Sequence, residues 1–139
     1  MSRAATPPAV VLGLTLTLAL AACGTPSPDL FVVHRTGTVP GAKLDLLVSD
    51  TSARCNSDAP RPLSSPQILE ARDITKDLLE LQRAKTALPP APPPQIFRFA
   101  VRSEAGTLRY GDTTQRPTIL PRLTRFVRDV AIGLCGLQR

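Results

Sequence analysis

Histidine and carboxylate side chains could perform acid–base chemistry in this chain, and candidates for it are few. His34 is the only histidine among 139 residues. A Ser–His–Asp or Cys–His arrangement needs a base within reach of its nucleophile, and no Gly-x-Ser-x-Gly motif or glycine-rich phosphate loop accompanies His34. Carboxylates that could form a glycosidase pair are Asp29, Asp45, Asp50 and Asp58. Their spacing singles none of them out, so we expect no catalytic residue and no enzyme.

A second kind of chemistry, lipid attachment, is indicated near the N-terminus. The apolar stretch 9–18 is too short to span a bilayer, which needs about 20 apolar residues. Leu20-Ala21-Ala22-Cys23 follows, an aliphatic residue and two small residues before a cysteine. This order resembles the lipobox of bacterial lipoproteins, whose cysteine takes a diacylglyceryl group and fatty acyl chains such as palmitate. The resemblance implies a signal peptide over 1–22, peptidase recognition of Leu20, Ala21 and Ala22, and lipidation of Cys23.

Two other origins of this N-terminal pattern stay open: an ordinary secretory signal with a chance cysteine, and an apolar helix of a soluble protein. With the lipobox, residues 23–28 form a short tether of about 3.3 Å per residue at most. Residues 29–139 then form a single domain held at the extracytoplasmic face of the cell membrane. We expect its partners to be that membrane, through the anchor, and an envelope protein or a protease.

The remaining thiols indicate a disulfide. Once Cys23 carries lipid, Cys55 and Cys135 remain, and two cysteines in an oxidising compartment most economically pair. Two buried free thiols or one reactive cysteine are the alternatives. No Cys-x-x-Cys motif and no Cys/His ligand spacing is present in the sequence, so we expect no metal site and no cofactor.

The charge of the chain is basic, with 17 Lys and Arg against 11 Asp and Glu and a formal net charge of +6. With no Trp, one Tyr and four Phe, the chain lacks the stacking residues expected of a nucleic-acid binder, and we expect no nucleic-acid partner. Arg122, Arg125 and Arg128 repeat every three residues opposite an apolar helix face. They could contact anionic headgroups or wall polymers, or simply form a solvated face.

Apolar periodicity predicts the elements that position these groups. Strands are expected at 30–35, 42–49, 53–56, 96–103 and 107–111. Helices are expected at 64–83, where Ser64 and Gln67 suit a capping box, and at 118–134. The proline run 89–94 is interpreted as a stiff connector, or else as a ligand for a proline-reading domain. The order indicates an α+β fold: a small antiparallel sheet of two hairpins, with four to five strands, and two helices packed on one face.

Several short stretches carry family resemblances. The stretches 29–33, Gly37, Pro40-Gly41-Ala42, 54–56, 69–72 and Cys135-Gly136 resemble small, uncharacterised actinobacterial lipoproteins. Arg35-Thr36-Gly37, Leu88-Pro89, 97–101 and 121–130 follow a layout similar to that of emfourin-type inhibitors of thermolysin-like metalloproteases. Gly37-Thr38-Val39 replaces the double glycine and aromatic residue of that family's first turn. The second resemblance implies a binding turn at Thr36, Gly37, Pro40 and Gly41.

Three functions are therefore weighed from the sequence. The first is a membrane-anchored, non-enzymatic module that binds a ligand or supports the envelope. The second is a protease inhibitor that presents the turn 36–41. The third, an enzyme, would need a concave site in which His34 meets two acids.

Overall fold

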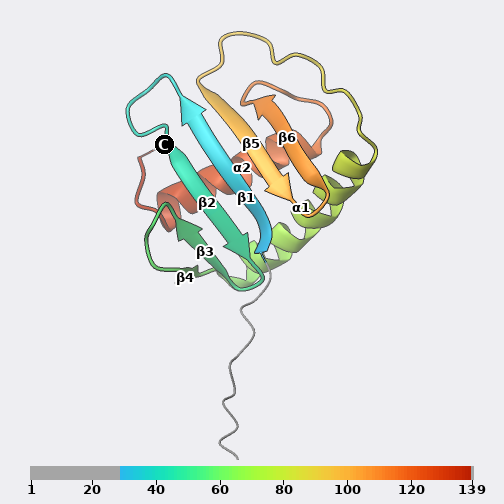
Figure 1. Ribbon diagram of the computed structural model, residues 1–139. Coiled ribbons are helices and arrows are strands. Elements are labelled where there is room, and N and C mark those ends of the chain that lie inside the picture. The colour runs from blue at the N-terminus through green and yellow to red at the C-terminus, as the bar shows by residue number, and fades with distance from the viewer. Residues whose placement is uncertain (1–28, 139) are drawn as a thin grey trace, which may run out of the picture.

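The computed structural model describes residues 29–138. The predicted signal peptide, the peptidase motif Leu20-Ala21-Ala22, the lipidation site Cys23 and the tether lie outside the described residues. In the described part, one antiparallel sheet has the strand order β4-β3-β2-β1-β5-β6, and two helices lie behind it (Figure 1). The strands are β1 (Asp29–Gly37), β2 (Leu44–Ser49), β3 (Ser52–Cys55), β4 (Arg61–Pro62), β5 (Phe97–Ser103) and β6 (Gly106–Gly111). The helices are α1 (Ser65–Arg83) and α2 (Ile119–Gly133).

The predicted α+β fold is confirmed, with one strand more than expected. The additional strand is β4, which pairs with β3 through Ser52 opposite Pro62 and Ala53 opposite Arg61. Two residues are too few to show alternation, and proline is disfavoured inside a sheet but tolerated at its edge. The sequence pattern therefore favoured a loop there. No helix within residues 29–138 has the length and apolar character needed to cross a membrane.

Alternation along the strands determines which face of the sheet is covered. In β1, Phe31 and Val33 are buried whereas His34 and Thr36 are exposed, because successive side chains point to opposite faces. The buried side chains meet apolar residues of both helices, and Phe31 contacts Phe126 edge-on with ring centroids 6.1 Å apart. The core thus lies between the sheet and the helix pair, and it has a single layer.

Local signals explain how α1 begins. Ser64 accepts a hydrogen bond from the backbone N–H of Gln67, and the Gln67 side chain accepts one from the backbone N–H of Ser64. This is the predicted capping box, and it satisfies two backbone donors that the first turn would otherwise leave open. The sequence pattern placed both ends of α1 and of α2 to within about two residues, the usual uncertainty of helix ends.

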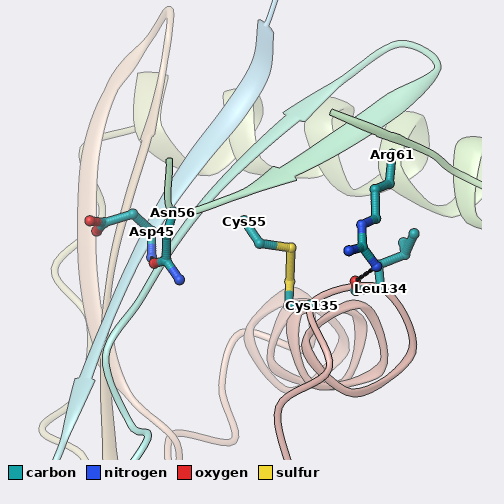
Figure 2. Close-up of a disulfide and its surroundings, with 6 residues drawn as sticks. All are labelled: Asp45, Cys55, Asn56, Arg61, Leu134 and Cys135. Carbon is teal, nitrogen blue, oxygen red and sulfur yellow. Dashed lines mark hydrogen bonds between the residues drawn. A yellow bond between two sulfur atoms is a disulfide. The ribbon is translucent and has the colours of Figure 1, made fainter. Parts of the chain in front are cut away.

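The predicted disulfide is confirmed. Cys55 and Cys135 are joined with sulfur atoms 2.00 Å apart and a sequence separation of 80. The bridge ties β3 to the turn after α2, and the guanidinium of Arg61 donates to the carbonyl of Leu134 beside it, at 2.9 Å (Figure 2). On the strand next to β3, the carboxylate of Asp45 points away from this bridge (Figure 2). The disulfide therefore lies on the face of the sheet that the helices cover, whereas the side chain of Asp45 lies on the opposite face.

Candidate functional site

The face of the sheet away from the helices is the surface on which polar side chains gather. No element of the described chain packs over its centre (Figure 1). We call it the open face and define it by the outward-pointing strand residues Val32, His34, Thr36, Asp45, Leu47, Arg54, Arg98, Ala100, Arg102, Thr107 and Arg109. Antiparallel sheets commonly have one face exposed to water, so exposure of this face is not by itself a sign of function.

The charge pattern of the open face is unusual in its lack of internal pairing. Arg54, Arg98, Arg102 and Arg109 are all exposed. Within residues 29–138, none of these four guanidinium groups has an ion-pair or hydrogen-bond partner. Asp45 is the one carboxylate among the described open-face positions, and it is already bonded to His34.

Three exposed arginines elsewhere on the molecule are paired with acids. Arg72 lies 3.0 Å from Asp50, Arg83 lies 3.1 Å from Glu104, and Arg128 lies 3.6 Å from its neighbour Asp129. These exposed pairs contribute little to stability, but they neutralise charge locally. Arg72, Arg83 and Arg128 thus differ from the four open-face arginines, which have no such partner within residues 29–138.

His34 and Asp45 form a bonded pair within this face. The two residues are directly opposite in the β1–β2 register, and His34 Nδ1 lies 2.6 Å from Asp45 Oδ1. Asp45 is held in turn, because its backbone N–H donates to Asn56 Oδ1 at 3.0 Å. Both side chains are about half exposed, at 53% and 48%. A carboxylate on Nδ1 orients the imidazole ring and leaves Nε2 for a ligand.

Within residues 29–138, neither a hydrogen-bonded nucleophile nor a second acid accompanies this pair. No hydroxyl or thiol of residues 29–138 is hydrogen-bonded to the His34 ring, so no nucleophile is assembled beside the base. His34 meets one acid in the described structure, whereas the enzyme hypothesis required two. Nor do three His, Cys, Asp or Glu side chains of the described chain gather closely enough to hold a metal ion.

A groove of about 520 Å³ lies at one side of the open face. Its sheet side is formed by His34, Thr36, Arg98, Ala100 and Arg109. The opposite wall comes from the proline-containing connector between α1 and β5, mainly residues 88–91, with Gln95 at one end. Ala100 lies directly between His34 on β1 and Arg109 on β6, so its small side chain leaves room between two polar ones.

The connector is packed in place and is more than the stiff spacer that the sequence predicted. Gln95 donates to the carbonyl of Ala91 at 3.0 Å, and Thr113 donates to the carbonyl of Pro92. A β-carbon at Gly111 would lie 2.5 Å from Gln95 Oε1 and 2.8 Å from Ala91 Cβ, so glycine allows this close approach. The wall of the groove is therefore fixed against the end of β6.

The predicted arginine row on α2 divides in the structure. Arg125 and Arg128 are exposed as expected. Arg122 instead reaches α1: its Nε lies 2.6 Å from Glu70, and its terminal nitrogens lie 3.5 and 3.4 Å from Asp73 and Asp77. The hydrogen bond from Arg122 lowers the pKa of the Glu70 carboxyl, with burial acting in the opposite direction. Arg122 thus joins the two helices, a contact that periodicity along α2 does not reveal, whereas contact of the arginine row with an anionic surface stays a prediction.

The predicted binding turn is exposed and braced from below. Thr36, Gly37, Pro40 and Gly41 all lie at the surface, and Gly41 has φ of 74°, a value that glycine adopts without strain. Arg35, 2% exposed, donates from Nε to the carbonyl of Ala42 at 2.9 Å and from Nη2 to that of Gly41 at 3.3 Å.

Sequence reasoning missed this buried arginine. Its guanidinium lies 4.8 Å from the ring centroid of Phe97, and burial lowers its pKa. The available signal was position: Arg35 follows Phe31 and Val33 at intervals of two, on the covered face.

No protein-family model, curated protein or solved structure matches this chain. The resemblances to actinobacterial lipoproteins and to emfourin-type inhibitors therefore stay predictions from the sequence. Function has to be argued from the open face, the groove and the braced turn.

Proposed function

We propose that this chain is an exported, lipid-anchored module without catalytic activity, which binds an anionic partner through its open face. The observation that carries the proposal is the set of four exposed arginines on that face, none of which has a partner within residues 29–138. Arginine presents a planar fork of donors that matches carboxylate and phosphate groups. An unpaired guanidinium can engage such a group without first breaking an internal ion pair.

The location in this proposal rests on the lipobox motif Leu20-Ala21-Ala22-Cys23. Lipid on Cys23 and the tether that follows would hold the domain at a membrane, where anionic envelope components are abundant. The first strand begins at Asp29, so five residues, 24–28, lie between the proposed anchor at Cys23 and the sheet. A binding role needs only this placement and an exposed recognition face.

Two variants with equal loss of charge test the open face. The first replaces Arg54, Arg98, Arg102 and Arg109 with glutamine; the second, as control, replaces Arg72, Arg83, Arg125 and Arg128 with glutamine. All eight residues are exposed. Retention of the full-length chain on a phosphate-bearing cation-exchange matrix is measured as the salt concentration at elution. We expect the open-face variant to elute at a clearly lower salt concentration than the control, since a clustered patch binds more strongly than dispersed charges.

Equal elution of the two variants would contradict the proposal, because net charge alone would then explain binding. The anchor is tested separately by fractionating an exporting bacterial host. We expect the wild-type chain in the membrane fraction, labelled by radioactive palmitate, and Cys23→Ala in the soluble fraction without label. A Cys23→Ala chain that stays with the membranes would refute lipid anchoring and leave the open-face result untouched.

Protease inhibition is a second candidate because the turn 36–41 is both exposed and braced by Arg35. A rigid exposed loop binds with a smaller loss of conformational entropy than a flexible one. The test is inhibition of thermolysin by the full-length chain, with Pro40→Gly as the variant expected to weaken it. Full thermolysin activity at a high micromolar concentration of the chain would contradict the inhibitor hypothesis.

A further inference from the structure

We infer that the groove beside Ala100 binds a phosphoryl group carried by a ligand in solution or on the cell wall. This inference rests on the proposed function, because it identifies the chemistry of the anionic partner. The groove is lined on its sheet side by two unpaired arginines, Arg98 and Arg109, and by the His34 imidazole.

The strand register places these three residues around Ala100. Ala100 pairs with His34 on one neighbouring strand and with Arg109 on the other. Arg98 precedes Ala100 by two residues on the same face, and it is a diagonal neighbour of Arg109, at a typical separation of about 7–8 Å. Arginine side chains span such a distance, so both guanidinium groups can meet one ligand above Ala100.

The number and direction of the donors favour phosphate over carboxylate. Two arginine forks line the groove on its sheet side with the His34 imidazole beside them, and Gln95 and Thr36 are further polar lining residues. A phosphoryl group offers three acceptor oxygens in a tetrahedral arrangement, whereas a carboxylate offers two in a plane. Since Asp45 occupies Nδ1 of His34, Nε2 is the ring nitrogen left to face the ligand.

The volume of the groove limits the size of what enters it. About 520 Å³ falls within the range of small-molecule sites, roughly 300–1,000 Å³. The fixed connector forms one wall, so the site is recessed on that side and does not present a flat surface. A phosphorylated sugar or one phosphate-bearing unit of a polymer would fit this description.

The position of the groove in the sheet argues against headgroups of the anchoring membrane. The chain enters the sheet at Asp29, and Thr36 lies seven residues further along the same strand, about 23 Å away. The groove lies toward that far end, because Thr36 pairs with Arg98 there. Headgroups of the anchoring membrane would therefore meet the near end of the sheet, about 23 Å from Thr36 and from the groove.

The test is a titration of the full-length chain, in detergent micelles, with inorganic phosphate at constant ionic strength. Backbone amide shifts of Ala100 and Gly111 in nitrogen-15 NMR spectra report binding. We expect saturable shifts with a dissociation constant of about 1 mM. Arg98→Gln and Arg109→Gln should each weaken binding about tenfold, the usual effect of one charge-assisted hydrogen bond. Arg54→Gln, the matched control on the same face, should change it less than about twofold.

Three results would overturn the inference. They are unshifted Ala100 and Gly111 amides at about 50 mM phosphate, an equal loss of affinity in Arg54→Gln and Arg109→Gln, and acetate binding as tightly as phosphate. If the two charge variants described above still eluted differently from the phosphate-bearing matrix, anion binding by the basic open face would stand without this site. Arg109→Lys keeps the charge but lacks the fork, so it repeats the test in a variant that preserves packing.

A lipid arm distinguishes the source of the phosphate. Vesicles of phosphatidylglycerol and of phosphatidylcholine are added to the phosphate-saturated chain. We expect neither to displace phosphate from the groove. If phosphatidylglycerol vesicles displaced it, the ligand would be a lipid headgroup, and the distance between Asp29 and the groove would not keep the groove from the membrane.

Discussion

Replacing both Cys55 and Cys135 with alanine should destabilise the domain by about 4.5 kcal/mol. The value follows from chain entropy: a cross-link between residues separated by 80 positions removes the loop-closure freedom of that segment from the unfolded state. For a domain of this size, about 4 °C in melting temperature corresponds to 1 kcal/mol. We therefore expect a decrease of roughly 15–20 °C in melting temperature for the variant.

The folded state should change less than the unfolded one. Arg61 still donates to the carbonyl of Leu134 in the variant, and Leu134 and Leu137 still pack against the core, so the end of α2 keeps its position. The unfolded chain, freed of its cross-link, exposes more surface. The denaturant dependence of unfolding, the m value, should consequently rise.

Equilibrium unfolding in urea, followed by circular dichroism, measures both quantities in one experiment. Wild-type chain in a reducing agent is the control, since it loses the bond but keeps both sulfur atoms in the packed structure. A loss below about 1.5 kcal/mol with an unchanged m value would contradict this prediction, because the cross-link would then not restrict the unfolded state.

Three further substitutions are expected to have distinct effects. Arg122→Gln should lower the free energy of unfolding by about 0.5–1 kcal/mol at neutral pH, since Arg122 and Glu70 are each about a third exposed. Urea unfolding across pH should show this difference from wild type shrinking below pH 4.5, because the lowered pKa of Glu70 stabilises the fold only while its carboxylate is ionised. Gln82→Ala should lower the free energy of unfolding by about 2–3 kcal/mol, since it removes the donor to two carbonyls of the β5–β6 hairpin. An unchanged melting temperature would show that water replaces this donor. Gly37→Ala should lower the free energy of unfolding by about 1–3 kcal/mol, because the added β-carbon would lie 2.4 Å from the carbonyl oxygen of Ile96. An unaltered melting temperature would show that the start of β5 can move away.

Much of the fold was predictable because its signals are local. Alternation in β1 and β5 identified the covered and open faces, and Ser64 with Gln67 marked the start of α1. The disulfide followed from a count, since only two cysteines remain once Cys23 is assigned to lipid. These inferences need no knowledge of which strands are neighbours.

The candidate site was less predictable because it depends on strand order. β1 lies next to β5, although β2, β3, β4 and α1 intervene in the chain, and this adjacency places His34 two strands from Arg109. The sequence pointed instead to the arginines of α2, of which Arg122 proved to be paired with acids of α1. Spacing along one helix cannot reveal a partner 52 residues away.

The sequence alone predicted the classes of element, the side of each strand that enters the core and the Cys55–Cys135 bond, all of which the structure confirms; lipid attachment at Cys23 stays a prediction. Which arginines are paired, and the role of the proline connector as one wall of a groove, are visible only in the folded molecule. The two kinds of feature differ in the range over which their interactions act. Periodicity and capping act within a few residues, whereas ion pairing and groove formation require the sheet order and the register to be established first.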